Sequence, residues 1–130
     1  SGAVDYLAQG EVAAEVSDLF QEEPQMTLAA PEILIVEVIS ALRRTTAAGR
    51  ISAWHASEAI EDLGRMRLEL FPSLPLRRRA WELRENVTAY DAMFVALAEL
   101  LGEPLATKDR PLAKAVARHT SVETILLGSQ

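Results

Sequence analysis

Cysteine is absent from this sequence of 130 residues. That absence excludes disulfide bonds, thiolate chemistry and zinc sites built on cysteine. The chain also lacks an apolar run of the roughly 18 residues that a membrane span needs, and no secretory signal peptide is visible. These absences predict a cytoplasmic protein with no membrane association. Its length favours a single domain over residues 1–130, long enough to bury a proper core.

Aromatic residues are also scarce, at 5% of the chain, although hydrophobic residues of all kinds reach 49%. The core must therefore consist mainly of Ala, Leu, Val and Ile. This composition suits a helix-rich α/β protein better than a β-sandwich.

Basic residues are missing from the first 42 positions, which hold eight acids. The net charge of −6 argues at first against nucleic acid as a partner. The rest of the chain, however, holds all 13 basic residues against 11 acids, and 11 of the 13 are arginines. They gather at Arg43–Arg44, at Arg65 and Arg67, and at Arg77–Arg79. Guanidinium groups suit phosphate contacts, although arginine clusters on helices are often only solvated faces.

The apolar spacing predicts helices that alternate with short strands. Four strands are expected over 25–30, 68–71, 104–107 and 122–127, and helices over 1–8, 11–23, 31–49, 53–67, 75–86, 89–102 and 110–118. Ser52 and Thr88 are candidate N-caps, and Pro31 is a candidate first-turn proline. The alternation predicts βαβ units, a parallel sheet and helices on both of its faces. An α/β domain normally opens with a strand, and here the first predicted element is a helix.

Three carboxylates stand out by their surroundings. Glu37 lies in the apolar helical run ILIVEVISAL, where a charge is costly unless it is paired or coordinated. The alternative is that the helix turns Glu37 toward water, or that an arginine pairs with it. Asp91 falls in the first turn of an apolar helix, where the helix dipole alone would explain it. Asp109 follows the strand that ends at Thr107. The structural alternative for Asp109 is a helix cap, and the structural alternative for Thr107 is an ordinary β-branched strand residue.

Taken together, these positions can converge at the carboxyl edge of a parallel sheet, where open α/β sheets bind ligands. Carboxylates without histidine or cysteine among them make a hard oxygen site, which suits Mg²⁺ or Mn²⁺ rather than Zn²⁺. His55 and His119 are interpreted as surface or half-buried helical residues. The sequence therefore predicts a metal site made of acids.

The stretches PEILIVEVISALRR and NVTAYDAMFVALAELLGEPLATKDRPLAKA resemble PIN-domain ribonucleases, specifically the VapC toxins of bacterial toxin–antitoxin pairs. The resemblance covers essentially the whole chain, and the patterns P-x5-E-x4-L-R-R, Y-D-A and L-x-T-x-D are specific in this order. It implies a three-layer α/β/α sandwich around a parallel sheet and Mg²⁺- or Mn²⁺-dependent cleavage of tRNA or ribosomal RNA. It also implies a VapB-type antitoxin that blocks the acid pocket. Abundant alanine on the helices fits close packing, including a homodimer face.

Residue by residue, the resemblance implies that Glu37, Asp91 and Asp109 form the catalytic metal site. Glu37 and Asp91 would be direct ligands and Asp109 a direct or water-mediated one. Thr107 would orient a ligand or the attacking water. These four residues are the predicted site.

The family also carries an acid at the end of its first strand, within a D-x-S pattern. Ser1 resembles the serine of that pattern, so this acid and the first strand are expected upstream of Ser1. Asp5 is no substitute, because it would lie about one turn into the first predicted helix. Two alternatives stay open: a catalytically degenerate PIN-like binding or regulatory module, and a phosphoacceptor receiver domain, which is also α/β with acids at strand ends.

Overall fold

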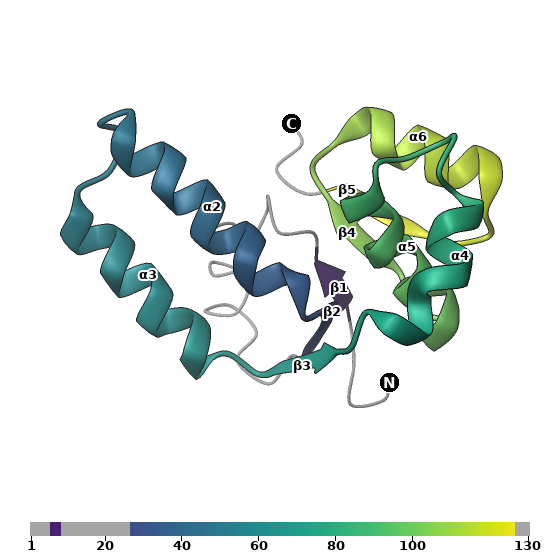
Figure 1. Cartoon of the computed structure of the whole chain (residues 1–130), viewed down its shortest axis with the longest axis horizontal. Helices are drawn as coiled ribbons and strands as arrows, with labels where there is room; N and C mark the ends of the chain where they lie inside the picture. The colour runs from purple at the N-terminus through teal and green to yellow at the C-terminus, as the bar shows by residue number, and fades with distance from the viewer. Residues whose placement is uncertain (1–5, 9–26, 127–130) are drawn as a thin grey trace.

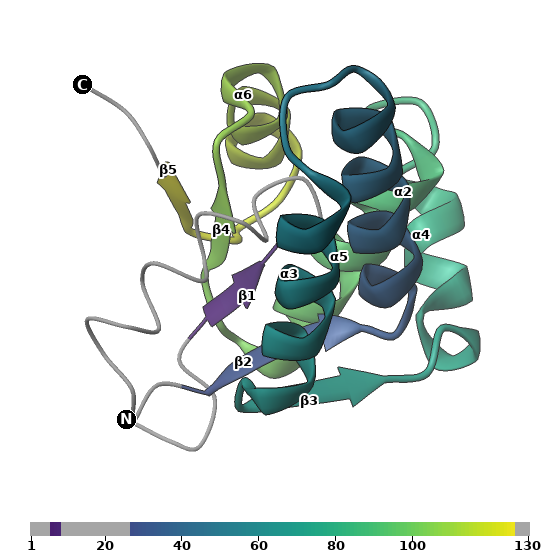
Figure 2. The ribbon, with the colours of Figure 1, turned by 90° about the vertical axis from the view of Figure 1, so that its left-hand side faces the viewer.

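The computed structural model describes residues 6–8 and 27–126. In chain order the elements are β1 (Tyr6–Ala8), β2 (Leu28–Pro31), α2 (Ile33–Ala47), α3 (Ala53–Arg65), β3 (Leu68–Phe71), the 3₁₀ helix η2 (Leu74–Leu76), α4 (Arg77–Glu82), α5 (Ala89–Leu101), β4 (Leu105–Thr107), α6 (Arg110–His119) and β5 (Thr124–Leu126). The strands form one parallel sheet in the order β3-β2-β1-β4-β5. Figure 2 shows them side by side in this order.

The direction of the crossovers places helices on both faces of the sheet. The chain moves outward from β2 to β3 through α2 and α3, and in the opposite direction from β3 to β4 and β5 through α4, α5 and α6. Because such connections are right-handed, the two groups of helices cover opposite faces. Figure 1 shows α2 and α3 on the left of the strands and α4, α5 and α6 on the right. This arrangement is the predicted α/β/α sandwich.

The strand order also decides between two α/β folds. Receiver domains have the order 2-1-3-4-5, whereas this sheet has the order 3-2-1-4-5. The receiver interpretation is therefore wrong for this chain.

The central strand β1 differs from the sequence-based prediction. The predicted helix over 1–8 is wrong for Tyr6–Ala8, which pair with β2 on one side and with β4 on the other. This pairing overrides local preference, because the facing backbone groups of β2 and β4 would otherwise lack partners. The sheet thus has five strands where four were expected. The expectation that the first strand lies upstream of Ser1 is wrong, because β1 takes the central place in the sheet. Ser1, Asp5 and the predicted helix over 11–23 lie outside the described residues.

Most predicted helix ends agree with the structure. The Ser52 side chain accepts a hydrogen bond from the His55 N–H and caps α3, and Thr88 caps α5 in the same way. Pro31 is an exception, because it ends β2 opposite Phe71 instead of opening α2. The last position of a strand tolerates the missing N–H of proline and its fixed φ. The helix expected over 75–86 is also shorter, since it divides into η2 and α4.

Helix α5 forms the centre of the core. Its side chains at Ala92 and from Phe94 to Ala98 are buried, and the helix packs on β2, β1 and β4. Small alanines on this helix let the sheet approach closely, and Phe94 fills the remaining volume with no exposed surface. None of the helices in the described part of the chain is long and apolar enough to cross a membrane.

An ion pair fixes α4 against α5. Arg79 donates to both carboxylate oxygens of Glu99, from Nε at 2.7 Å and from Nη2 at 2.9 Å, and a third donor reaches Glu82 at 3.2 Å. The hydrogen bond to Glu99 raises the pKa of the Arg79 guanidinium above its usual value. Such a two-point contact sets the relative orientation of two helices, which a single-point contact cannot do.

Two glycines are expected to respond to alanine with opposite signs. Gly102 ends α5 with φ at +67°, and a Cβ there would meet nothing within 4 Å. An alanine would therefore destabilise the protein only through the strain of its backbone at positive φ. We expect Gly102→Ala to lower the free energy of unfolding by about 1–2 kcal/mol. Gly64 lies in α3 with the same open space and no positive φ, so Gly64→Ala is expected to raise it by roughly 0.5–1 kcal/mol. Urea unfolding of both variants measures the difference, and changes of the same sign would contradict this account.

Candidate active site

The predicted site residues lie along the carboxyl edge of the sheet. Helix α2 begins two residues after β2 ends, and α6 begins three residues after β4 ends, so both start at this edge. Helix α5 leads back to the start of β4, and its first turn therefore also lies toward the carboxyl edge. Ligands of open α/β sheets bind at this edge.

Asp91 lies in the first turn of α5. The Thr88 hydroxyl accepts a hydrogen bond from the Asp91 backbone N–H at 3.2 Å, and this contact fixes the start of the helix. The Asp91 side chain is half-buried. A carboxylate at this position is stabilised by the positive end of the helix dipole, whatever else it binds.

Thr107 and Asp109 are linked at the end of β4. Thr107 is fully buried, and its Oγ1 accepts a hydrogen bond from the Asp109 N–H at 3.1 Å. Asp109 Oδ1 in turn accepts from the Leu112 N–H at 3.0 Å and caps α6. The structural alternative for Asp109 is thus present in the molecule. Helix capping uses only the Oδ1 atom of Asp109, and Oδ2 makes no hydrogen bond to the described residues.

Glu37 lies on the second turn of α2, half-buried, with its Oε1 shielded from solvent. It lines a pocket of about 210 Å³ together with Val36, Ser40 and Arg44 of α2 and Tyr90 of α5. We call this cavity the Glu37 pocket. Tyr90 directly precedes Asp91, so the structure brings Glu37 to the first turn of α5, where the second predicted ligand lies. Of the four predicted residues only Glu37 lines this pocket, and Asp91, Thr107 and Asp109 do not.

The acids do not form a ready-made cluster. Within residues 6–8 and 27–126, no three acidic or histidine side chains come close enough together to hold one metal ion. The chemistry of the ligand atoms still fits a hard divalent cation, since Glu37 and Asp91 offer carboxylate oxygens and no histidine or methionine is among the described residues that line the pocket. Glu37 and Asp91 are thus the residues that would hold it.

The sequence did not identify Tyr90 and Ser40 as residues of the pocket. Ser40 and Arg44 follow Glu37 by three and seven positions, a spacing that places all three side chains on one face of a helix. This spacing was a usable signal. Tyr90 carries no such signal, because its place opposite α2 depends on how α5 packs.

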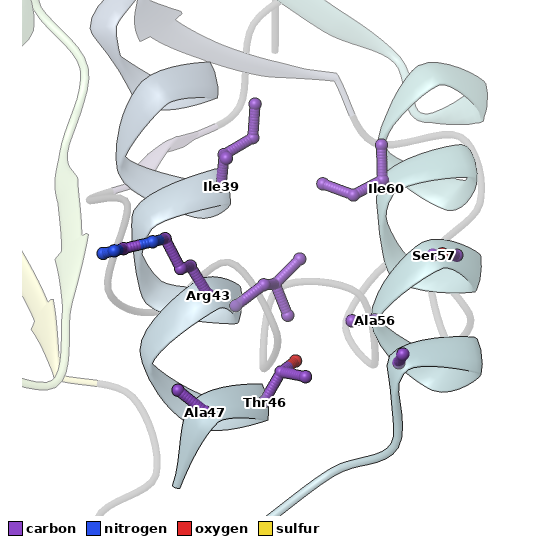
Figure 3. A pocket seen from close by; sticks show the side chains of 9 residues that line it. Ile39, Arg43, Thr46, Ala47, Ala56, Ser57 and Ile60 are labelled. Carbon is purple, nitrogen blue, oxygen red and sulfur yellow. The ribbon is translucent and has the colours of Figure 1, made fainter.

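Helix α2 borders an apolar groove on its other side. Two cavities of about 410 and 380 Å³ run between α2, α3 and β3, and they share Ile39 and Ile60. Figure 3 shows Ile39 and Thr46 of α2 facing Ile60 and Ala56 of α3 across this space. The Thr46 hydroxyl is buried there without a hydrogen-bond partner among the described residues. We call this space the α2–α3 groove.

Comparison with known sequences identifies the class of this protein. The family profile described as PIN domain matches residues 2–118. Ribonuclease VapC12 of Mycobacterium tuberculosis (strain ATCC 25618 / H37Rv) is 31% identical over 125 residues, which cover 96% of this chain and 95% of VapC12. Ribonuclease VapC1 of the same strain is 44% identical over 87 residues, which cover 66% of this chain and only 65% of VapC1.

Solved structures show the same fold. PAE2754 from Pyrobaculum aerophilum has a TM-score of 0.75 at 24% identity, with 94% of this chain and 83% of that chain covered. VapBC2 from Rickettsia felis, bound to a DNA fragment from their promoter, has a TM-score of 0.63 at 13% identity, with 95% and 98% covered. The chain is a PIN domain. Within that class it belongs to the family of VapC ribonucleases.

Proposed function

We propose that this protein is a metal-dependent endoribonuclease, the toxin of a toxin–antitoxin pair, which hydrolyses phosphodiester bonds of tRNA or ribosomal RNA. One observation carries the proposal beyond family membership. Glu37 lines one pocket together with Tyr90, the residue directly before Asp91, so two carboxylates that are distant in the sequence lie toward the same edge of the sheet.

The residues of the site would divide the work as follows. Glu37 and Asp91 hold Mg²⁺ or Mn²⁺, and Asp109 assists directly or through water by its Oδ2. Thr107, which already fixes the backbone of Asp109, keeps that carboxylate in place. When bound, the cation lowers the pKa of water and offsets negative charge on the phosphate.

The first test is cleavage of total tRNA and ribosomal RNA by the wild-type protein in Mn²⁺ and in EDTA. We expect defined fragments in Mn²⁺ and none in EDTA, because a bound cation is needed to activate the attacking water. Folded wild-type protein that cuts no RNA in either condition would favour the alternative, a PIN-like binding or regulatory module without catalysis.

Manganese is expected to stabilise the folded chain. A ligand that binds only the native state adds stability, about 2.7 kcal/mol at 100 times its Kd. Thermal unfolding in millimolar Mn²⁺ should therefore give a Tm at least about 2 °C higher than in EDTA. The same ion should leave the Tm of Glu37→Gln unchanged, and an equal shift in both proteins would place the binding elsewhere.

Substitutions of Asp109 separate its role as a cap from its role toward the metal. Asparagine caps helices as well as aspartate does, so Asp109→Asn should keep the free energy of unfolding and lower cleavage about 10-fold or more. Asp109→Ala should lose about 1 kcal/mol of stability as well. Urea unfolding and RNA cleavage are measured on both variants. Full cleavage by a stable Asp109→Asn protein would leave Asp109 as a helix cap alone.

We also propose a VapB-type antitoxin as the protein partner. The solved neighbour VapBC2 is such a pair, and the α2–α3 groove offers a continuous apolar surface on the helix that carries Glu37. An antitoxin segment seated there could reach across α2 and cover the Glu37 pocket. Co-expression with the antitoxin should yield a stable complex without RNA cleavage.

A homodimer and a cytoplasmic location complete the proposal. Leu74, Trp81 and Leu100 are exposed by 70%, 65% and 65% on the helical layer opposite α2, and a second copy would cover such side chains. Sedimentation equilibrium tests this association.

A location in the cytoplasm follows from the proposed RNA substrate.

A further inference from the structure

The Glu37 pocket has an arginine at one end and an aromatic ring on its rim. Glu37, Ser40 and Arg44 line one side of it from α2, and Tyr90 lines the other from α5. The role proposed above for Glu37 and Asp91 leaves Ser40, Arg44 and Tyr90 without a function. These side chains offer a hydroxyl, a guanidinium and an aromatic ring, which suit a phosphate or a base of the substrate better than a metal ion.

Arg44 is held in place within this pocket. Its Nη1 donates a hydrogen bond to Ser40 Oγ at 2.9 Å, which directs the guanidinium back along α2 by one turn toward Glu37. No carboxylate among the described residues forms an ion pair with Arg44. The exposed guanidinium therefore presents its other N–H donors to the pocket and to solvent. A positioned guanidinium of this kind binds phosphate oxygens in a defined geometry.

Tyr90 presents an aromatic ring next to this cation. The side chain is 55% exposed although it stands beside the half-buried Asp91 on the first turn of α5. Exposure of a large ring at the rim of a polar pocket costs hydrophobic free energy that burial would recover. An unpaired nucleobase stacks well on such a ring, whatever its sequence.

We propose that Arg44, Ser40 and Tyr90 form a nucleotide subsite beside the acids. The inference rests on the proposed ribonuclease function and deepens it. Arg44 binds a phosphate next to the scissile one, Ser40 orients its guanidinium, and Tyr90 stacks on an unpaired base. The substrate class that follows is RNA with a splayed, single-stranded segment at the cleavage point, since a paired base could not reach the ring.

Two variants with matched controls test the subsite. Arg44→Ala is compared with Arg43→Ala, because Arg43 is also exposed but borders the α2–α3 groove instead of the pocket. Tyr90→Ala is compared with Tyr90→Phe, which keeps the ring. Fluorescence anisotropy measures the Kd of a mixed-sequence, single-stranded oligoribonucleotide in EDTA, so that binding is read without cleavage, over a series of KCl concentrations.

The expected results differ between the two residues. Arg44→Ala should weaken binding about 10-fold and reduce the slope of log K against log salt by roughly 0.7, the value for one phosphate on a single strand. Arg43→Ala should change neither quantity. Tyr90→Ala should weaken binding by about 5- to 100-fold with an unchanged slope, whereas Tyr90→Phe stays within about 2-fold of wild type. In Mn²⁺, both alanine variants should raise KM more than they lower kcat.

Other outcomes would overturn the inference. Equal salt slopes for Arg44→Ala and Arg43→Ala, in a wild-type protein that cuts RNA, would remove the subsite and leave the ribonuclease intact. A wild-type protein that neither binds nor cuts RNA would remove both. Normal RNA binding by Arg44→Ala, with loss of antitoxin binding, would assign this surface to the protein partner. If Arg44→Ala unfolds, Arg44→Lys is measured instead. It keeps the positive charge, so the slope of log K against log salt should equal that of wild type, and a reduced slope would contradict the subsite.

Discussion

Replacing Asp91 with asparagine is expected to lower RNA cleavage in Mn²⁺ at least about 100-fold. Asparagine keeps the size of the side chain and removes the charge that would hold a divalent cation. Changes to residues that only hydrogen-bond the ligands of a metal already cost 10- to 100-fold. The bound cation itself supplies several kcal/mol of charge stabilisation in such reactions. Gel analysis of total tRNA and ribosomal RNA, with Mn²⁺ or EDTA, measures the loss.

Asp62→Asn is the control for this variant. Asp62 is an exposed carboxylate on α3 that pairs with Arg65 at 2.9 Å, and an exposed pair of this kind contributes little. We expect its cleavage rate to stay within about 2-fold of wild type. Undiminished cleavage by a folded Asp91→Asn protein would exclude Asp91 as a metal ligand and leave it as a charge at the start of α5.

Truncation of Phe94 should have the largest effect on stability. The ring has no exposed surface and lies in α5, the helix that contacts β2, β1 and β4. Loss of a buried phenyl group costs its transfer free energy and leaves a cavity, about 3–5 kcal/mol in all. Since a small domain has only about 5–15 kcal/mol to lose, Phe94→Ala should be close to unfolded at physiological temperature. Urea unfolding followed by circular dichroism measures the change.

Tyr90→Ala serves as the control on the same helix. Both variants remove an aromatic ring from α5, but Tyr90 is 55% exposed, so its loss should change the free energy of unfolding by less than about 1 kcal/mol. Equal losses for Phe94→Ala and Tyr90→Ala would contradict the position of α5 at the centre of the core.

Helix ends were predictable from the sequence because capping is local. The Ser52, Thr88 and Asp109 side chains each accept a hydrogen bond from an N–H three residues later, so a short window of sequence contains the whole interaction. The layer order followed from the alternation of helices and strands for a similar reason. The helices were long enough to show their own period, and they separated the short apolar runs that form β2 to β5.

Strand β1 was not predictable in this way. Its residues become a strand through Leu7, which pairs with Ala29 on one side and with Leu105 on the other. Neither partner is near in the sequence. A segment this short takes its conformation from its neighbours in the sheet, and the local pattern cannot report those neighbours.

The candidate site was also predictable only in part. The acids were recognisable because carboxylates are unusual in apolar surroundings, and Glu37 is such a case. Glu37 and Tyr90 line one pocket because of where the fold places α2 and the start of α5, which no spacing in the sequence expresses. The sequence also could not show that one carboxylate oxygen of Asp109 accepts a hydrogen bond from the Leu112 N–H.

Helix α2 is a common wall between two cavities, with Glu37, Ser40 and Arg44 on the pocket side and Ile39 and Thr46 on the groove side. A shift or rotation of this one rigid element changes both cavities together. The two sites are then linked thermodynamically: a molecule in the groove that alters the affinity of the pocket tenfold must itself bind tenfold differently when the pocket is filled. If RNA binds in the pocket and an antitoxin segment binds in the groove, as proposed above, each can change the affinity for the other through the position of the helix between them.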